Sequence, residues 1–222
     1  SLGVFNKNMH ILTAFHVYIE KLFEIELNRG MENSKNYILS TNQESPDLAV
    51  KIENAEFRYF NAEKNIFSDL NINIQKNKHT IITGPNGSGK STLLGLISGV
   101  LYPTKGTVSV ISDKFGYVGA NPLILNSSLR ENLMYGNNKK ISDEELVNYL
   151  KLFKTFENED RYNLEIEVSN KSLSSGQMQK IAFIRTLVYG VDILILDEST
   201  ANLDLESKKV IYRIIEDLNI TI

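Results

Sequence analysis

The chain has 222 residues, 42% of them hydrophobic and 23% charged, which is enough for one large folded domain or two small ones. Its formal net charge of −3 disfavours nucleic acid as the main partner, and the absence of cysteine excludes disulfides, thiolate catalysis and cysteine metal sites. No apolar run reaches the roughly eighteen residues of a membrane span, so none of the sequence is predicted to cross a membrane.

The first part of the chain, residues 2–27, has the apolar spacing of an amphipathic helix, and Gly30 stands where such a helix would stop. This helix either packs on its own domain or continues from a segment outside the chain. Residues 31–47 are polar and predict a linker, with a domain boundary near Asp47.

From Leu48 onward, short runs with alternating apolar residues predict strands. These runs cover residues 49–52, 55–59, 66–74, 107–111 and 114–118. A further buried strand is predicted at residues 79–83, directly before a glycine-rich loop.

That loop fits the pattern G-x-x-x-x-G-K-[ST] and is followed by an apolar helical stretch. It consists of Gly84, Pro85, Asn86, Gly87, Ser88, Gly89, Lys90, Ser91 and Thr92. Glycines let the backbone turn its N–H groups toward a polyphosphate, and the helix start adds more N–H groups and a positive dipole end. Lys90 can reach the β- and γ-phosphates, and Ser91 can ligate Mg²⁺. The loop therefore predicts binding of a nucleoside triphosphate.

The second half of the chain predicts mostly helix, interrupted by one buried parallel strand. Helices are predicted at 128–134, from Ser142 to about Phe153, after Gln177 and at 206–218, with a final strand at 219–222. The buried strand, Ile193–Leu196, ends in Asp197 and Glu198. In phosphate-loop proteins an acid at this place holds Mg²⁺ beside the loop, and Glu198 is positioned to deprotonate an attacking water.

The segment from Leu173 to Gln177 resembles the Leu-Ser-Gly-Gly-Gln signature of ABC-type ATPases, and a basic residue and an apolar helix follow it. The phosphate loop, this signature and the Asp197-Glu198 pair occur in the family's order, with Asp204 shortly after. From about residue 48 to 222 the chain is therefore similar to the ATP-binding domain of ABC transporters, of the exporter half-transporter type.

The resemblance implies an α/β fold, with a phosphate-loop (RecA-like) core, an antiparallel β subdomain and an inserted α-helical signature subdomain at about residues 126–178. The N-terminal helix and linker, residues 1–47, would extend the last transmembrane helix of an exporter. The ATPase domain would cover residues 48–222 and be truncated before the family's switch histidine.

Site residues carry over by position. Tyr59 resembles the aromatic residue that stacks on adenine, and the loop from Gly84 to Thr92 would hold the phosphates. The resemblance implies ATP and Mg²⁺ as cofactors, with Ser91 and Asp197 as the metal ligands. Glu198 would be the catalytic base, and Lys90 would assist catalysis.

The signature residues have an implied role between subunits. Ser174, Ser175, Gly176 and Gln177 would contact the γ-phosphate of a nucleotide held by a second subunit, and Asp204 would belong to the adjoining D-loop. The working unit would be a head-to-tail pair of identical or different ATPase subunits. A transmembrane domain would precede them in the same polypeptide, at the cytoplasmic face of a membrane, with no nucleic acid expected.

The sequence departs from the family pattern in four places. Ala120 stands where a glutamine normally contacts Mg²⁺ and the attacking water, although the neighbouring Asn121 could substitute with a shorter reach. Ser175 replaces the second signature glycine. The strand region between Gly106 and Tyr117 is shorter than in most exporters, and the chain ends before the expected switch histidine.

Two other functions stay open. The chain could be a soluble ABC ATPase acting on ribosomes or nucleic acid, which would want basic surfaces or a second ATPase copy. It could also be a regulatory, weakly hydrolysing nucleotide-binding module. Ala120 supports this reading, and Glu198 argues against it.

Overall fold

The computed structural model describes residues 30–40, 47–137, 139–157, 162–200 and 203–222; the helix predicted at 2–27 lies outside them. The described chain divides into two compact units. The first holds the residues up to Ile74 and residues 81–113, and the second holds residues 75–80 and 114–222. No helix in these described ranges is long and apolar enough to cross a membrane.

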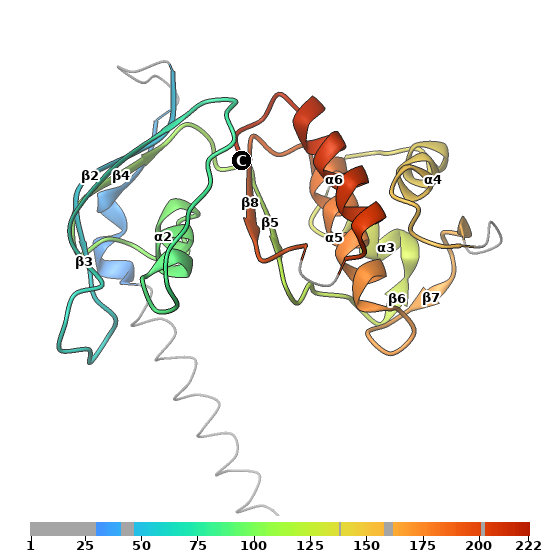
Figure 1. Ribbon diagram of the computed structural model, residues 1–222, viewed down its shortest axis with the longest axis horizontal. Helices are drawn as coiled ribbons and strands as arrows, with labels where there is room; N and C mark the ends of the chain where they lie inside the picture. The colour runs from blue at the N-terminus through green and yellow to red at the C-terminus, as the bar shows by residue number, and fades with distance from the viewer. Residues whose placement is uncertain (1–29, 41–46, 138, 158–161, 201–202) are drawn as a thin grey trace, which may run out of the picture. The chain divides into compact units, whose positions relative to one another are not determined.

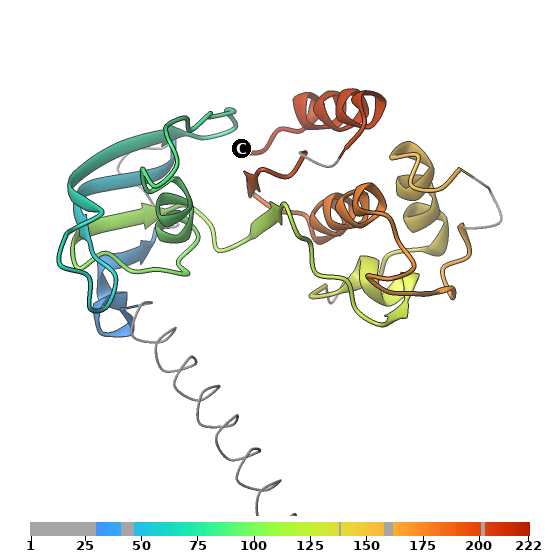
Figure 2. The ribbon, with the colours of Figure 1, turned by 60° about the horizontal axis from the view of Figure 1, so that its bottom comes forward.

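The first unit is a four-stranded sheet with one helix against its face (Figures 1 and 2). The strand order is β1-β4-β2-β3, with β1 at Tyr37–Leu39, β4 at Lys105–Val110, β2 at Leu48–Phe57 and β3 at Phe67–Gln75. The helix is α2, Lys90–Ile97. Strands β2 and β4 run antiparallel, as the family resemblance implied for the β subdomain, whereas β1 runs parallel to β4.

A bulge joins the two strands predicted at 49–52 and 55–59 into the single strand β2. The pairing with β4 shifts register between Glu53 and Glu56, and Asn54 takes a left-handed conformation with φ 47°. Gly106 lies opposite, where a Cβ atom would come within 2.3 Å of the Asn54 carbonyl oxygen. The bulge therefore requires glycine on the facing strand.

Residues 31–39, expected as part of a linker, instead form the 3₁₀ helix η1 (Met31–Asn36) and strand β1. The Tyr37 hydroxyl donates to the carbonyl oxygen of Ile97, the last residue of α2, at 2.8 Å, and its ring packs on Gly99 and edge-on against Tyr102 at 5.9 Å. The Asn36 amide donates to the Pro103 carbonyl at 2.9 Å. The polar composition gave no sign of this fold, because the segment is held by the Tyr37 side chain, by the Asn36 hydrogen bond and by backbone pairing with β4, and not by a long apolar run.

The buried strand predicted at residues 79–83 is not formed, and Ile81 is 87% exposed. The backbone here pairs only at its start, where Thr80 N donates to Ile222 O at 2.7 Å and Ile222 N donates to Lys78 O at 3.1 Å. A strand needs such a neighbour along its whole length to satisfy its backbone groups.

The second unit contains the parallel pair β5 (Phe115–Gly119) and β8 (Ile193–Asp197) and a group of helices (Figure 1). The helices are α3 (Leu129–Met134), α4 (Asp143–Leu152), α5 (Ser175–Tyr189) and α6 (Leu205–Asp217), and a short antiparallel pair joins β6 (Ser127–Ser128) to β7 (Glu167–Val168). The strand predicted at 219–222 is reduced to one bridge between Thr221 and Ile193.

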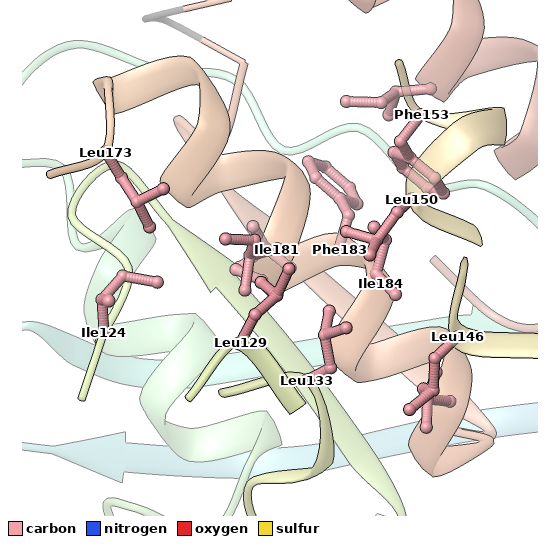
Figure 3. Close-up of a cluster of buried hydrophobic side chains, with 14 of the residues drawn as sticks. Ile124, Leu129, Leu133, Leu146, Leu150, Phe153, Leu173, Ile181, Phe183 and Ile184 are labelled. Atoms are coloured by element: carbon pink, nitrogen blue, oxygen red, sulfur yellow. The ribbon is translucent and has the colours of Figure 1, made fainter. Parts of the chain in front are cut away.

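The helices of the second unit enclose one apolar core, in which side chains from α3, α4 and α5 converge (Figure 3). Its members with no exposed surface at all are Val118, Leu129, Leu133, Leu146, Leu150, Ile181 and Ile184. Ser128 and Ser142 accept hydrogen bonds from the third helical residue of α3 and α4, which fixes where each helix begins. The core and these caps set the position of α5, whose start carries the signature segment.

Candidate functional site

The phosphate loop bends into the start of α2 through glycines that no other residue could replace without strain. Gly89, the N-cap of α2, has φ 92°, and Gly87 has φ 79°. A Cβ on Gly89 would lie 2.8 Å from the side chain of Ile66 and 2.9 Å from that of Phe67. At Gly89, therefore, both the left-handed backbone and the lack of space for a Cβ atom require glycine.

The start of α2 has the features of an anion-binding helix N-terminus. Its N-cap is a glycine, which has no side chain to cap the helix, and its first turn has no acidic residue. The helix itself therefore places no negative side chain beside its first N–H groups and the positive end of its dipole. The Lys90 ammonium donates to the carbonyl oxygens of Gly84 at 2.9 Å and Pro85 at 3.0 Å, which holds it over the loop. Ser91 is exposed in the same turn. These donors fit a polyphosphate.

Tyr59, the predicted adenine-stacking residue, lies against the first turn of α2. Its hydroxyl shares a hydrogen bond of 2.9 Å with the hydroxyl of Thr92, which is only 6% exposed. Its ring meets Phe57 edge-on, with the centroids 5.0 Å apart. The first unit therefore brings Tyr59 and the phosphate loop together.

In the second unit, Asp197 ends β8 directly opposite Gly119 of β5. The Tyr117 hydroxyl donates to Asp197 Oδ2 at 3.0 Å. Burial, together with the hydrogen bond and the negative charge of Asp197, raises the pKa of Tyr117. No sequence motif pointed to Tyr117, one of ten tyrosines in the chain. Ala120 and the exposed Asn121 follow at the same edge.

Glu198, the predicted base, is exposed and has φ 52°, the left-handed region that non-glycine residues seldom adopt. Such a conformation costs on the order of 1 kcal/mol or more, and strain of this kind concentrates at functional sites. The turn after β8 thus holds the Glu198 carboxylate away from the direction that a continuing strand would give it.

The signature segment opens α5 with a reciprocal cap. Ser174 Oγ accepts from Gln177 N at 3.2 Å, and Gln177 Oε1 accepts from Ser174 N at 2.9 Å. The spacing of Ser174 and Gln177 is the capping-box pattern and could have been predicted. Ser174 and Ser175 are exposed, and Gly176 is half-buried. The Ser174 hydroxyl accepts in this cap and keeps its own proton to donate to a ligand.

Asp204 is the N-cap of α6. Its two carboxylate oxygens accept from Ser207 N at 2.8 Å and from the Ser207 hydroxyl at 2.7 Å, and these bonds lower the pKa of Asp204. Lys154 connects the start of α6 to α5. Its ammonium pairs with Glu206 of α6 at 2.5 Å, and its carbonyl oxygen accepts a hydrogen bond from the ammonium of Lys180 on α5 at 2.9 Å.

A buried polar network that the sequence analysis missed holds the loop after β5. Asn132, fully buried, donates to the carbonyls of Leu125 and Ser128, both at 3.1 Å, and accepts from Leu125 N at 2.8 Å. Arg185 of α5 donates to Asn132 O at 2.8 Å and to Leu123 O at 3.0 Å. The loop therefore has a fixed backbone, although it contains no helix or long strand.

Thus the phosphate loop and Tyr59 are arranged within the first unit, while Asp197, Glu198, the signature segment and Asp204 are arranged within the second. The described residues contain no cluster of three or more histidine, cysteine or acidic residues suited to a metal ion. A Mg²⁺ site built from one carboxylate, one hydroxyl and substrate phosphates needs no such cluster. Each predicted ligand, Ser91 in the first unit and Asp197 in the second, carries an oxygen of the kind that Mg²⁺ binds.

Comparison with known proteins gives a consistent result. A family model described as "ABC transporter" matches residues 67–201. An ATP-dependent permease of Candida albicans, MDL1, is 34% identical over 188 residues, which are 77% of this chain and 27% of that protein. The lactococcin-A transport/processing ATP-binding protein LcnC of Lactococcus lactis is 32% identical over 175 residues, covering 72% of this chain and 24% of that protein. The chain thus spans about a quarter of these relatives.

A shorter relative is a putative ABC transporter ATP-binding protein of Clostridium acetobutylicum, 32% identical over 193 residues, which are 78% of this chain and 68% of that protein. Among solved structures, a bacterial Atm1-family ABC exporter with ATP bound matches with a TM-score of 0.68 and 22% identity. The match covers 84% of this chain and 35% of that one. This likeness shows the fold.

Proposed function

The chain belongs to the ABC transporter family, and from this premise we propose that it is the part of an exporter that binds and hydrolyses ATP to drive transport. The observation that carries the proposal is the start of α5, where an exposed, reciprocally capped Ser174 opens a helix with no acidic residue in its first turn. Such a helix start suits a phosphate group.

ATP binding follows from the family and is supported by the phosphate loop. Lys90 and the first N–H groups of α2 would face the phosphates, the ring of Tyr59 would offer a stacking surface for adenine, and Ser91 and Asp197 are the proposed Mg²⁺ ligands. Bound Mg²⁺ would neutralise charge that develops on the phosphate oxygens. Glu198 would take the proton of the attacking water, with its carboxylate held by the strained turn after β8.

The signature segment is proposed to act on the nucleotide of a second subunit. Ser174 would donate its hydroxyl proton to the γ-phosphate, and the N–H groups of Ser175 and Gly176 would add to the anion site. ATP would then hold two subunits head to tail, and hydrolysis would let them part. That cycle would move membrane helices attached to each subunit at the cytoplasmic face of the membrane.

Whether the membrane part and the ATPase share one polypeptide is inferred by analogy with the relatives. Two Lactococcus lactis relatives are named ATP-binding and permease proteins, which supports a transmembrane part upstream in the same polypeptide. In this arrangement the helix predicted at residues 2–27 would continue from the last membrane helix. The Clostridium relative is named only as an ATP-binding protein, and it favours a second candidate in which the ATPase is a separate subunit.

Two substitutions in the full-length protein test the proposal. Lys90→Ala removes the ammonium held over the loop and should abolish ATP binding, whereas the exposed Lys105→Ala on β4 of the same unit should not. Glu198→Gln should bind ATP as the natural protein does but lose turnover by two or more orders of magnitude, with Glu144→Gln on α4 as its control.

Fluorescent-ATP titration, phosphate release and mass in solution give the readouts. The Glu198→Gln protein with Mg-ATP should associate through its ATP-binding domains, and Lys90→Ala should not. Natural turnover in Glu198→Gln would remove the base role from Glu198, and unchanged affinity in Lys90→Ala would remove the phosphate-loop site.

A further inference from the structure

Strand β5 ends beside Asp197, but the residue that follows it, Ala120, has no polar side chain to offer there. We propose that Tyr117 is the positioning residue for the Asp197 carboxylate, holding Oδ2 through its hydroxyl so that Oδ1 is presented to a divalent cation. The inference rests on the proposed function, because it concerns the cation that accompanies ATP.

The strand geometry aims Tyr117 at Asp197. Gly119 lies opposite Asp197 in the β5–β8 ladder, and Tyr117 lies two residues earlier, on the same face of the strand. The tyrosine ring runs along this face toward the strand end, and its hydroxyl reaches Asp197 Oδ2 at 3.0 Å.

Gly119 provides the space for that ring. A Cβ atom at this position would lie 2.9 Å from Tyr117 Cε1 and 3.0 Å from the Tyr117 hydroxyl oxygen. The glycine itself has no left-handed backbone conformation, so conformational freedom does not account for it. The three atoms nearest to that Cβ position all belong to Tyr117, which makes the two residues a matched unit.

The chemistry requires such a partner. Rotation about the last side-chain torsion of an aspartate can turn either carboxylate oxygen outward, and a hydrogen bond to one oxygen selects the orientation that presents the other. Outer partners of this kind commonly change metal affinity by about 10- to 100-fold when removed. Tyr117 is 58% exposed, and water competes for its bond to Asp197, so a loss of about 3- to 10-fold is expected.

The decisive measurement is cation affinity, separated from nucleotide affinity. Full-length protein carrying Glu198→Gln, to prevent hydrolysis, is saturated with ATP and titrated with Mn²⁺, whose unbound form is counted by its electron paramagnetic resonance signal. Tyr117→Phe keeps the ring and loses the hydroxyl, so its Mn²⁺ affinity should fall about 3- to 10-fold. Fluorescent-ATP affinity in EDTA and the unfolding temperature should stay unchanged.

Gly119→Ala tests the geometry without touching the hydroxyl. The new methyl group must displace the Tyr117 ring, so this variant should weaken Mn²⁺ binding as Tyr117→Phe does. Combined with Tyr117→Ala, which removes the ring, Gly119→Ala should add no further loss. An equal loss in both backgrounds would show that Gly119 acts independently of Tyr117 and would overturn the matched unit.

The control is Tyr162→Phe, which removes a hydroxyl that donates to the Phe156 carbonyl at 3.0 Å in the same unit, and its Mn²⁺ affinity should be unaltered. Unchanged Mn²⁺ affinity in Tyr117→Phe would overturn the proposal. Tighter Mn²⁺ binding would also overturn it, because the hydroxyl would then compete with the cation for Asp197. Failure of the parent protein to bind fluorescent ATP in EDTA would instead refute the proposed function.

Discussion

Tyr37 gives the sharpest test of whether residues 31–39 belong to the folded domain. Removing its side chain, Tyr37→Ala, takes away three contacts. The half-buried ring on Gly99 is worth about 1 to 1.5 kcal/mol, roughly half of the value for full burial. The hydrogen bond to the Ile97 carbonyl adds about 1 kcal/mol, and the edge-on pairing with Tyr102 adds at least about 0.5 kcal/mol. The expected total is about 3 kcal/mol.

Native-state hydrogen exchange measures this loss locally, so it does not depend on how the two units unfold. In Tyr37→Phe only the hydroxyl is lost, and the β1 amides should exchange about fivefold faster, as expected for a loss of about 1 kcal/mol. In Tyr37→Ala they should exchange about a hundredfold faster or more. Ile38→Ala, whose side chain is 42% exposed on the same strand, should cost about 1 kcal/mol or less.

The outcome that would refute this reasoning is slow, unchanged exchange in both Tyr37 variants, or fast exchange of residues 31–39 in the natural protein. The first result would show that Tyr37 does not hold the segment in place, and the second would make the segment a linker, as its composition suggested. Gly99→Ala adds an internal check, because its methyl group would lie 3.0 Å from the Tyr37 ring and should cost less when Tyr37 is alanine.

Two further predictions concern stability in the second unit. Asn132→Ala leaves the backbone groups of Leu125 and the Ser128 carbonyl without their buried partner, and it should destabilise the protein by about 2 to 4 kcal/mol, measured by urea unfolding. The natural protein should lose the stability that Asp204 contributes as the pH falls, and Asp204→Asn should lack this pH-dependent part. Because bonds from Ser207 lower the pKa of Asp204 below its ordinary 3.8, its contribution is present above pH 3.8 and disappears as the pH falls through the lowered value. Unfolding curves of the two proteins should therefore converge in acid, and a constant difference would contradict the assignment.

The sequence predicted best those elements whose signals are local. Helix α4 carries its own N-cap, Ser142, and three acids in its first turn. Strand β8 is a continuous apolar run that ends at Asp197. In both cases the information lies within the element, so no knowledge of the partner is needed.

Elements that depend on a partner were not predictable in this way. Strand β1 exists because β4 offers an edge and Gly99 leaves room for Tyr37, and neither fact is visible in residues 31–39. Conversely, residues 79–83 have the composition of a buried strand but pair only at their start, with Ile222. Tertiary pairing decides these cases against local propensity.

The candidate site shows the same division. The phosphate loop follows a contiguous motif, and the structure places Lys90 at the start of α2 as that motif predicts. Tyr117 joins Asp197 only because of the β5–β8 register, across 80 positions of sequence. The strained φ of Glu198 also leaves no trace in the amino-acid pattern. Contacts set by register and backbone strain therefore had to be found in three dimensions.

The polar network around Asn132 ties the loop after β5 to helix α5, so that the two are expected to move together. Arg185 donates a hydrogen bond to the Leu123 carbonyl of this loop. It lies eleven residues after Ser174, the N-cap of the same helix, which is about 16 Å along the helix axis. A helix transmits displacement over this length with little bending. A displacement of the loop at Leu123 would therefore be carried to Ser174 by the helix itself, with no need for a relay of side chains between them.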